Sequence, residues 1–237
     1  MDKKENLSVA LCLLTWNEID GCKIDLPKID MDKFDQVYAV DGGSNDGTIE
    51  YMKECGINVL IQPIKGYNQA YLHAFKYCKC DALVLFHPKG TTSVEDLYKF
   101  KGYFEEGYNL VIASRLLKES TNEEDLYLFK PRKWFVKVIA LYSYVIWGKV
   151  KNKILWDVLH GFRGMLVKDF NKLSVLKEGI SVDIEMVIRS YKANFKYIEF
   201  PTKERKRVYG KTHFPATSSG LRILKYLLSE IGRKFLI

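Results

Sequence analysis

Four short and mostly apolar runs in the first half of the chain constrain its fold more than any other feature. They span residues 8–15, 36–40, 58–62 and 82–86. Runs of this length are typical of strands that are covered on both faces. The segments between them, 47–55 and 67–77 among them, are long enough for crossover helices, which indicates βαβ units. We therefore expect an α/β fold with a mostly parallel central sheet and helices on both faces.

The second half of the chain adds further elements to this expected sheet. The pattern predicts strands at 109–114 and 196–200, helices at 182–193 and from about residue 219, and a polar acidic loop over 118–127. We therefore expect one domain over residues 1–215 and an amphipathic C-terminal helix over 216–237.

Composition narrows the class of protein. With 47% hydrophobic and 28% charged residues, the chain can bury a core and is not of the disordered class. No apolar stretch of about 18 residues predicts a transmembrane helix. The five cysteines have the spacing of neither a disulfide scaffold nor a zinc site, and the first residues do not resemble a signal peptide. We therefore expect a cytoplasmic protein.

The net charge of +8, from 37 Lys and Arg against 29 Asp and Glu, predicts an anionic partner. Residues 131–153 carry six Lys and Arg and no acidic residue, around an apolar middle rich in aromatic side chains. This pattern suits either a helix in a membrane interface or an ordinary core helix with a solvated face. Its apolar middle, 138–147, is too short to span a bilayer.

A second cationic segment lies near the C-terminus. Its cations are Lys203, Arg205, Lys206, Arg207 and Lys211, with Glu204 as the one acid among them. Such a cluster suits phosphate binding, or else a solvated charged loop. Because no DNA- or RNA-binding motif is present, we expect no nucleic-acid partner.

Polar residues follow the expected strands at the points where these strands end. They are residues 15–18, 41–48 and 87–92. Because the carboxyl ends of parallel strands meet along one edge, we expect the functional site there. In 41–48 the glycines let the backbone approach a ligand, Asp41 can accept hydrogen bonds from a base or ribose, and Asn45 or Asp46 can cap the next helix.

Together these segments resemble the motifs of the family-two glycosyltransferases, which transfer sugars from nucleotide donors. Residues 15–18 resemble the family's P-x-Y-N-E, and residues 41–48 resemble its D-D-G-S-x-D-G-T. Residues 65–70, 114–115 and 160–163 resemble its G-x-G-x-A, G-S-R and S-G-F-R segments. The likeness covers about residues 7 to 214. It implies the GT-A fold, a Rossmann-like sheet with helices on both faces, here followed by a C-terminal amphipathic helix.

Within the family the chain is most similar to the branch of dolichyl-phosphate mannose synthase and polyprenyl-phosphate glycosyltransferases. The likeness lies in Asp157 before Gly-Phe-Arg, and in residues 183–185, 199–205 and 210–214. The branch implies inverting transfer from a UDP- or GDP-linked sugar to a polyprenyl or dolichyl phosphate. It also implies a protein that is peripheral on the cytoplasmic face of a membrane, with a membrane-apposed helix within 131–153.

The resemblance further implies roles for individual residues. Those implied to bind the donor are Leu14, Thr15, Glu18, Asp41, Gly43, Asp46, Lys65, His87 and Arg115, with Leu14 where the family often has proline. Those implied to bind the acceptor or its phosphate are Arg163, Arg205, Arg207 and Lys211. The implied catalytic set is Lys89, Asp157, Arg163 and Arg205. Since a phosphate acceptor is already anionic at neutral pH, Asp157 would orient groups rather than act as a strong base.

One departure from the family concerns its metal ion. The family has a D-x-D motif after the fourth strand, whose carboxylates hold Mg²⁺ or Mn²⁺ against the donor diphosphate. Here those positions carry His87 and Lys89. Because a protonated lysine does not ligate a cation and one histidine suits a hard ion poorly, the sequence predicts no ordinary metal site.

Several explanations fit this departure. Lys89, helped by His87, would supply the positive charge that the ion brings, which makes the transferase metal-independent. Alternatively, the chain is a degenerate relative that binds or scaffolds without turnover, or a metal is held by other groups such as Asp41 or a substrate phosphate. A further alternative keeps the transfer but uses a glycan hydroxyl in cell-surface polysaccharide assembly as acceptor, with Asp157 as the base.

Overall fold

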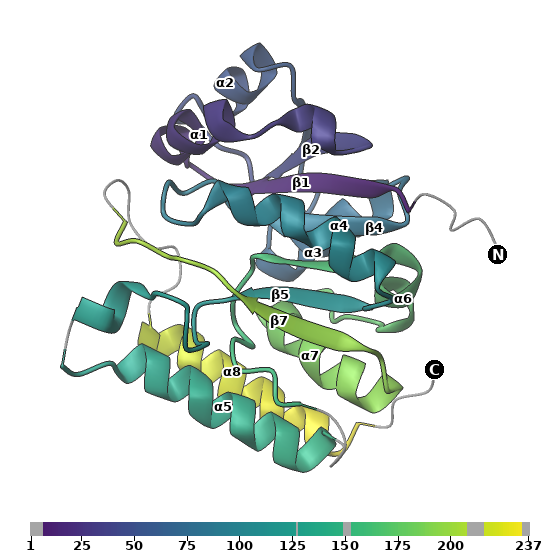
Figure 1. Ribbon diagram of the computed structural model, residues 1–237, viewed down its shortest axis with the longest axis vertical. Coiled ribbons are helices and arrows are strands. Elements are labelled where there is room, and N and C mark those ends of the chain that lie inside the picture. Colours follow the sequence, from purple (N-terminus) through teal and green to yellow (C-terminus); the bar gives the residue numbers. More distant parts are fainter. Residues whose placement is uncertain (1–6, 127, 149–152, 208–215, 234–237) are drawn as a thin grey trace.

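The computed structural model describes residues 7–126, 128–148, 153–207 and 216–233. Within them, seven strands form one sheet in the order β3-β2-β1-β4-β6-β5-β7 (Figure 1). The strands are β1 (Val9–Thr15), β2 (Gln36–Asp41), β3 (Asn58–Ile61), β4 (Ala82–Phe86), β5 (Leu110–Ser114), β6 (Arg163–Leu166) and β7 (Tyr197–Pro201). Strand β6 pairs antiparallel with β4 and β5, whereas the other pairings in the sheet are parallel.

Helices connect and cover the strands. The α-helices are α1 (Ile19–Asp25), α2 (Thr48–Glu54), α3 (Tyr67–Tyr77), α4 (Phe100–Glu105), α5 (Pro131–Trp147), α6 (Val167–Lys172), α7 (Val182–Ala193) and α8 (Ala216–Ile231). Short 3-10 turns occur at η1 (Leu26–Lys28), η2 (Met31–Lys33), η3 (Val94–Lys99) and η4 (Glu123–Leu126). No helix in the described part of the chain is long and apolar enough to cross a membrane.

The sheet separates two hydrophobic cores because successive side chains of a strand point to opposite faces. Ala10 and Cys12 of β1 enter a core that is shared with α3, α5, α6, α7 and α8. Leu11 and Leu13 enter the other core, which is shared with α1, α2, η3 and α4. Strand β1 is buried along its whole length, as expected of a strand with helices on both faces.

The structure confirms the elements that have clear periodicity. The four apolar runs are β1 to β4, and the helices expected at 47–55, 67–77 and 182–193 are α2, α3 and α7. The strands expected near 109–114 and 196–200 are β5 and β7. The pattern missed α1, α4, α6 and β6, which have only four to seven residues each, too few for a period to stand out.

The cationic segment 131–153 contains α5, and its residues 149–152 lie outside the described part of the chain. Pro131 begins this helix at a position where a missing N–H group costs nothing. Helix α8 begins at Ala216 and packs Ile223, Tyr226 and Leu227 into the core that α5 also enters. The two helices lie side by side along one edge of the molecule (Figure 1).

Candidate active site

Asp41, at the end of β2, holds the loop that follows it. One of its oxygens accepts hydrogen bonds from Thr15 Oγ1 and Ser44 Oγ, each at 2.7 Å. The other accepts from the backbone N–H groups of Gly43 at 2.8 Å and Ser44 at 2.7 Å. Four such bonds match the acceptor capacity of a carboxylate. Asp41 is fully buried and therefore fixes the backbone of this loop.

Further hydrogen bonds tie the β1–α1 loop to the β2–α2 loop. Asn17, which has a left-handed φ of 52°, donates its backbone N–H to Ser44 Oγ at 2.8 Å. Its Oδ1 accepts from the N–H of Asn45 at 2.9 Å. The N–H of Glu18 donates to Thr48 Oγ1 at 3.0 Å. The two loops therefore form one connected rim at the ends of β1 and β2.

Asp46 joins the starts of α1 and α2. Its Oδ1 accepts from the N–H of Thr48 at 3.0 Å, and its Oδ2 accepts from the N–H of Ile19 at 3.2 Å. Burial alone would raise the pKa of Asp46, but these hydrogen bonds outweigh burial and hold the pKa below its ordinary value. The carboxylate is therefore ionised at neutral pH, and it stabilises two helix N-termini.

Leu14 and Lys65 lie at different depths in this region. Leu14 is 4% exposed and packs in the core beneath the loops, so it supports the rim and does not line its surface. Lys65 is exposed, and its Nζ lies 3.2 Å from the position that a Cβ would take on Gly43. Gly43 has a φ of 86°, which favours glycine. A side chain at Gly43 would therefore be strained and would meet Lys65.

The segment 87–90, directly after β4, is held against α1. Gly21 permits this approach, because a Cβ there would lie 2.2 Å from Pro88 O. Asp25 Oδ2 accepts a hydrogen bond from the N–H of Gly90 at 2.7 Å. Burial raises the pKa of Asp25 to about 6, although the bond from Gly90 acts in the other direction. Helix α1 thus fixes the backbone that carries the side chains of this segment.

His87 lies half-buried beneath the strand ends. Its ring stacks on Tyr67 with centroids 6.1 Å apart, and a Cβ on Gly161 would lie 2.5 Å from its Cε1. Burial lowers the pKa of His87 well below its ordinary value, and the neighbouring Lys89 cation lowers it further. His87 is therefore neutral at neutral pH. It adds no positive charge to that of Lys89, contrary to the help that the sequence suggested.

Lys89 is half-buried among charges of both signs. Burial lowers the pKa of its ammonium below the ordinary value. Glu18 and Glu204 favour the charged form, while Arg207 and Arg115 oppose it. Lys89 and these four side chains form what we call the charged cluster. Its members lie after the ends of β1, β4 and β5 and on the tail after β7.

The charged cluster does not fit a hard divalent cation. The two positions that would carry the carboxylates of a D-x-D motif hold an imidazole, His87, and an ammonium, Lys89. The carboxylates of the cluster are already paired, Glu18 with an arginine at 2.7 Å and Glu204 with another at 3.2 Å. Across the described ranges, no three His, Cys, Asp or Glu side chains gather as metal ligands would.

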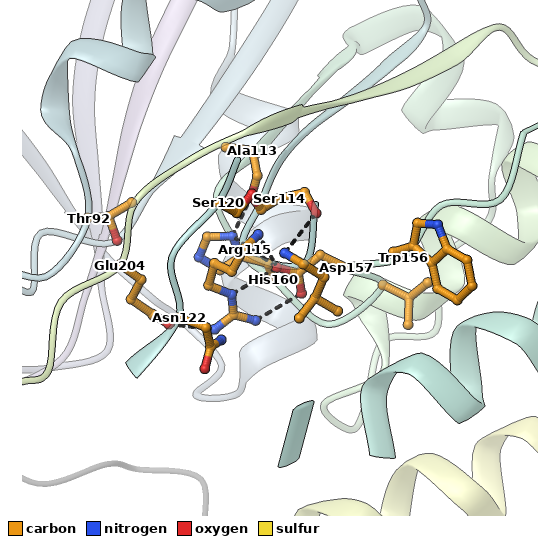
Figure 2. Close-up of polar contacts among 12 residues, drawn as sticks. Thr92, Ala113, Ser114, Arg115, Ser120, Asn122, Trp156, Asp157, His160 and Glu204 are labelled. Carbon is orange, nitrogen blue, oxygen red and sulfur yellow. Dashed lines mark hydrogen bonds and ion pairs between the residues drawn. The ribbon is translucent and has the colours of Figure 1, made fainter. Parts of the chain in front are cut away.

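Arg115, directly after β5, lies between two carboxylates (Figure 2). Its Nε and Nη2 donate to the two oxygens of Asp157, both at 2.9 Å, and its Nη1 pairs with Glu204 at 3.2 Å. Burial alone would raise the pKa of Asp157, but Arg115 outweighs burial and holds the pKa at about 2. Asp157 is fully buried, so it orients Arg115 and is poorly suited to act as a general base.

Two further ionisable groups support the segment that carries Asp157. Glu199 accepts hydrogen bonds from the N–H groups of Trp156 at 2.8 Å and Asp157 at 2.6 Å. Burial raises the pKa of Glu199 to about 7 in spite of these bonds. Burial also lowers the pKa of His160 to about 3. The neutral ring of His160 therefore donates from Nδ1 to Ala113 O at 2.6 Å (Figure 2).

The tail after β7 crosses the strand ends on two backbone bridges. One joins Glu204 to Thr92, which follows β4, and the other joins Lys203 to Thr121, which follows β5. The first bridge sets the carboxylate of Glu204 beside Arg115 (Figure 2). Residues far apart in the sequence therefore meet in one site.

Arg207 is a tail cation that reaches the rim of the site, where its Nη2 pairs with Glu18 Oε1 at 2.7 Å. Arg205 is exposed, and its backbone N–H donates to Thr91 O at 2.7 Å. Lys211, the remaining candidate for phosphate binding, lies outside the described residues. The structure thus brings Arg207 into the charged cluster and leaves the side chain of Arg205 in solvent.

Arg163, in β6, is fully buried and bound to protein groups. Its Nε donates to His160 O at 2.7 Å, and its Nη1 donates to Asp183 O at 2.6 Å. The same Nε lies 3.2 Å from Asp183 Oδ1. Because the guanidinium has no exposed surface, the expectation that it contacts a phosphate is wrong for this structure. Arg163 instead holds Asp183 in place.

Tyr67, which stacks on His87, belongs to a polar group to which the sequence assigned no function. Tyr67 Oη donates to Asp183 Oδ2 at 2.8 Å, and Tyr71 Oη donates to Asp183 Oδ1 at 2.7 Å. These bonds join α3 to the start of α7, which lies more than a hundred residues further along the chain. Two sequence signals pointed to this group: the resemblance of residues 183–185 to a family motif, and the spacing of the two tyrosines, which places them on one helix face.

The amino-acid sequence is similar to that of known proteins. Residues 28–173, more than half of the chain, match the family described as Glycosyl transferase family 2. Glycosyltransferase AglJ from Haloferax volcanii is 24% identical over 196 residues, which are 81% of this chain and 62% of that protein. The chain therefore spans less than two thirds of the length of this relative.

Solved structures share the fold. Glucosyl-3-phosphoglycerate synthase from Mycobacterium tuberculosis, in complex with phosphoglyceric acid, has a TM-score of 0.72 at 15% identity, over 96% of this chain and 81% of that one. The same enzyme in complex with Mg²⁺ and uridine diphosphate has a TM-score of 0.70 at 15% identity, over 96% and 80% of the two chains. With the mostly parallel seven-strand sheet and the match over 28–173, these likenesses show that the chain belongs to glycosyltransferase family 2 and has the GT-A fold.

Proposed function

We propose that this chain transfers a sugar from a UDP- or GDP-linked donor to a polyprenyl or dolichyl phosphate at the cytoplasmic face of a membrane. The transfer inverts the anomeric centre and needs no divalent cation. The observation that carries this proposal is the charged cluster, in which Lys89 stands in place of the metal-binding motif with Arg115 and Arg207 nearby. Family membership supports sugar transfer as the class of reaction.

The connected rim of the β1 and β2 loops supports binding of the nucleoside half of the donor. Asp41 and Asp46 fix its backbone before any ligand arrives, which reduces the entropy lost on binding. Trp16 is 46% exposed, and a Cβ on Gly42 would lie 3.2 Å from its Cγ, so an indole lies against the glycine loop. The structurally similar synthase binds uridine diphosphate and UDP-glucose.

Fixed cations can replace the metal ion because of where charge develops in the reaction. An oxygen of the acceptor phosphate attacks the anomeric carbon, and the bond from that carbon to the diphosphate breaks. The nucleoside diphosphate leaves with the electron pair, so negative charge grows on its terminal phosphate. An ammonium that is held in position stabilises this charge without reorganisation. Lys89 supplies that ammonium, and Glu18 and Glu204 balance part of the positive charge until the diphosphate binds.

A phosphate acceptor is supported by the cations of the tail and by the state of Asp157. Arg207 and the exposed Arg205 lie on a tail that crosses the strand ends. A phosphate is anionic at neutral pH and attacks without a strong base. This agrees with a site in which Asp157, with a pKa of about 2, is committed to Arg115.

A glycan hydroxyl is the alternative acceptor, and it would need a carboxylate base. Asp157 is unsuited to that role because of its ion pair and low pKa. Asp183 is no better suited, because it is 4% exposed and its Oδ1 lies 3.2 Å from Arg163 Nε. The described carboxylates of the site therefore favour a phosphate acceptor over a glycan hydroxyl.

The test is a transfer assay in EDTA with radiolabelled UDP- and GDP-sugars and a polyprenyl phosphate in membranes, followed by organic extraction. We expect label from one donor to enter the organic phase. Lys76→Met, which changes an exposed lysine of α3, serves as a surface control and should match the unaltered chain. Label in a water-soluble glycan would overturn the proposed acceptor, and absence of label from all fractions would overturn turnover itself.

A further inference from the structure

Helix α1 packs directly against the backbone of the segment that carries Lys89. A Cβ on Gly21 would lie 2.2 Å from Pro88 O and 2.7 Å from Lys89 Cα. Ile24, one turn further along α1, lies against the other side of Lys89, since a Cβ on Gly90 would lie 2.8 Å from its Cδ1. The backbone on both sides of Lys89 is therefore fixed by its contact with α1.

Asp25 provides the polar part of this contact. It follows Gly21 by four residues, which places it on the same face of α1. Its Oδ2 accepts a hydrogen bond from the N–H of Gly90 at 2.7 Å, and the N–H of Lys89 also favours its charged form. Hydrogen bonds to an ionised carboxylate are roughly twice as strong as those between neutral groups. The charge of Asp25 therefore tightens the backbone at Lys89 itself.

A carboxylate at this place lowers the stability of the fold. Asp25 is 2% exposed, and among the described residues it forms no ion pair. Burial raises its pKa to about 6, and the N–H of Gly90, the charge of Lys28 and the N–H of Lys89 compensate only in part. Groups whose pKa is shifted by burial in this way are more frequent at functional sites than elsewhere. The fold thus keeps a costly charge directly behind Lys89.

We propose that Asp25 is a positioning residue for sugar transfer, which it serves by fixing the backbone at Lys89. A fixed ammonium stabilises charge on the leaving diphosphate because it needs no reorganisation during the reaction. Glu18, directly before α1, also acts on Lys89. Helix α1 therefore sets the backbone of Lys89 near its end and an opposing carboxylate at its start. This role rests on the proposed function for the reaction that it serves.

The contribution of Asp25 should depend on pH, because its carboxyl takes up a proton near pH 6. The groups that face it are Lys28 of η1, Lys89 of the facing segment and the Cys22 thiol of α1, which stays neutral because burial raises its pKa. Asp25→Asn keeps the shape of the side chain without its charge. We expect this variant to lower kcat about tenfold at pH 8 and to match the unaltered chain at pH 5. The ratio of the two kcat values cancels the ionisation of the acceptor and of Glu199, which both chains share.

Further measurements separate positioning from a merely structural role. In a chain that already carries Lys89→Met, Asp25→Asn should cause no additional loss of kcat, because Asp25 acts through Lys89. The melting temperature of Asp25→Asn at pH 8 should not fall, since the variant removes a buried charge that lowers stability. The matched control is Asp169→Asn, which removes another carboxylate of 2% exposure, in α6 at the opposite edge of the sheet. It should keep its kcat at both pH values.

Amide hydrogen exchange without donor tests the position of the segment independently of turnover. At pH 8 we expect the amides of Lys89 and Gly90 to exchange about fivefold faster in Asp25→Asn than in the unaltered chain. If exchange changes in this way but the unaltered chain transfers no sugar, the proposed function fails while the contact of Asp25 with the segment stands. Unchanged exchange, a kcat ratio that is constant with pH, or a further loss in the chain with Lys89→Met would each overturn the positioning role.

Discussion

Replacement of Lys89 by methionine is expected to lower kcat/KM for sugar transfer by about 10²- to 10³-fold. Methionine keeps much of the length of the side chain but removes the ammonium. The negative charge that grows on the leaving diphosphate therefore loses the fixed cation that stabilises it. Because Lys89 is half-buried beside Glu18 and Glu204, its loss also leaves these carboxylates with one cation fewer. Steady-state kinetics in EDTA, with the melting temperature measured in parallel, checks this prediction.

Lys76→Met is the matched control, since it removes an exposed lysine of α3 that lies outside the charged cluster. A second variant, His87→Asp with Lys89→Asp, restores the family's carboxylates. It should be inactive in EDTA and regain part of its activity with Mn²⁺, because two carboxylates suit that ion. If this variant works as well as the unaltered chain with and without EDTA, Lys89 does not replace a metal.

Asp157→Asn is expected to lower the free energy of unfolding by about 3 kcal/mol at neutral pH. The change removes the charge that faces Arg115 and leaves a largely buried guanidinium with Glu204 as its one remaining ionic partner among the described residues. Chemical denaturation of the two proteins measures the difference. Activity should fall as well, since Arg115 loses the carboxylate that orients it within the charged cluster.

The effect of Asp157→Asn should depend on pH in a defined direction. The pKa of Asp157 is about 2 in the folded chain, against an ordinary value of 3.8. Its stabilising contribution is therefore complete above the ordinary value and is lost as the pH falls toward 2. Glu123→Gln, which removes the exposed pair with Arg132, is the control and should cost less than about 1 kcal/mol. An equal loss of unfolding free energy in both variants would show that the buried pair of Arg115 and Asp157 stabilises the fold no more than the exposed pair does.

The sequence predicted the central sheet and the place of the site because both follow from repeated local patterns. Apolar runs identify β1 to β4, and the polar segments after them mark the strand ends where the loops meet. Short elements such as β6 carry no period of their own, and their place is set by pairing with strands elsewhere in the chain. The sequence therefore indicated the class of fold but not the antiparallel strand in its middle.

In the candidate site, too, the sequence predicted the residues of the motifs but not the surroundings of each side chain. Arg115 and Arg163 both occur in family motifs, and their residue type gives no sign that one reaches the charged cluster while the other is fully buried. That difference depends on where each one lies, Arg115 directly after β5 and Arg163 within β6, and on the partners there, Asp157 or Asp183. The neutral state of His87 likewise depends on burial and on a neighbouring lysine, neither of which the sequence alone could establish.

The central claim, that the cations of this chain take the place of a divalent ion at the donor diphosphate, is tested most directly by nucleotide binding. The melting temperature is measured with UDP or GDP, in EDTA and in Mn²⁺, for the unaltered chain and for Lys89→Met. A ligand that binds the folded state raises its melting temperature. We expect one nucleotide to give the same rise in EDTA as in Mn²⁺, and Lys89→Met to lose it. A rise that appears only with Mn²⁺, or that survives in Lys89→Met, would contradict the claim.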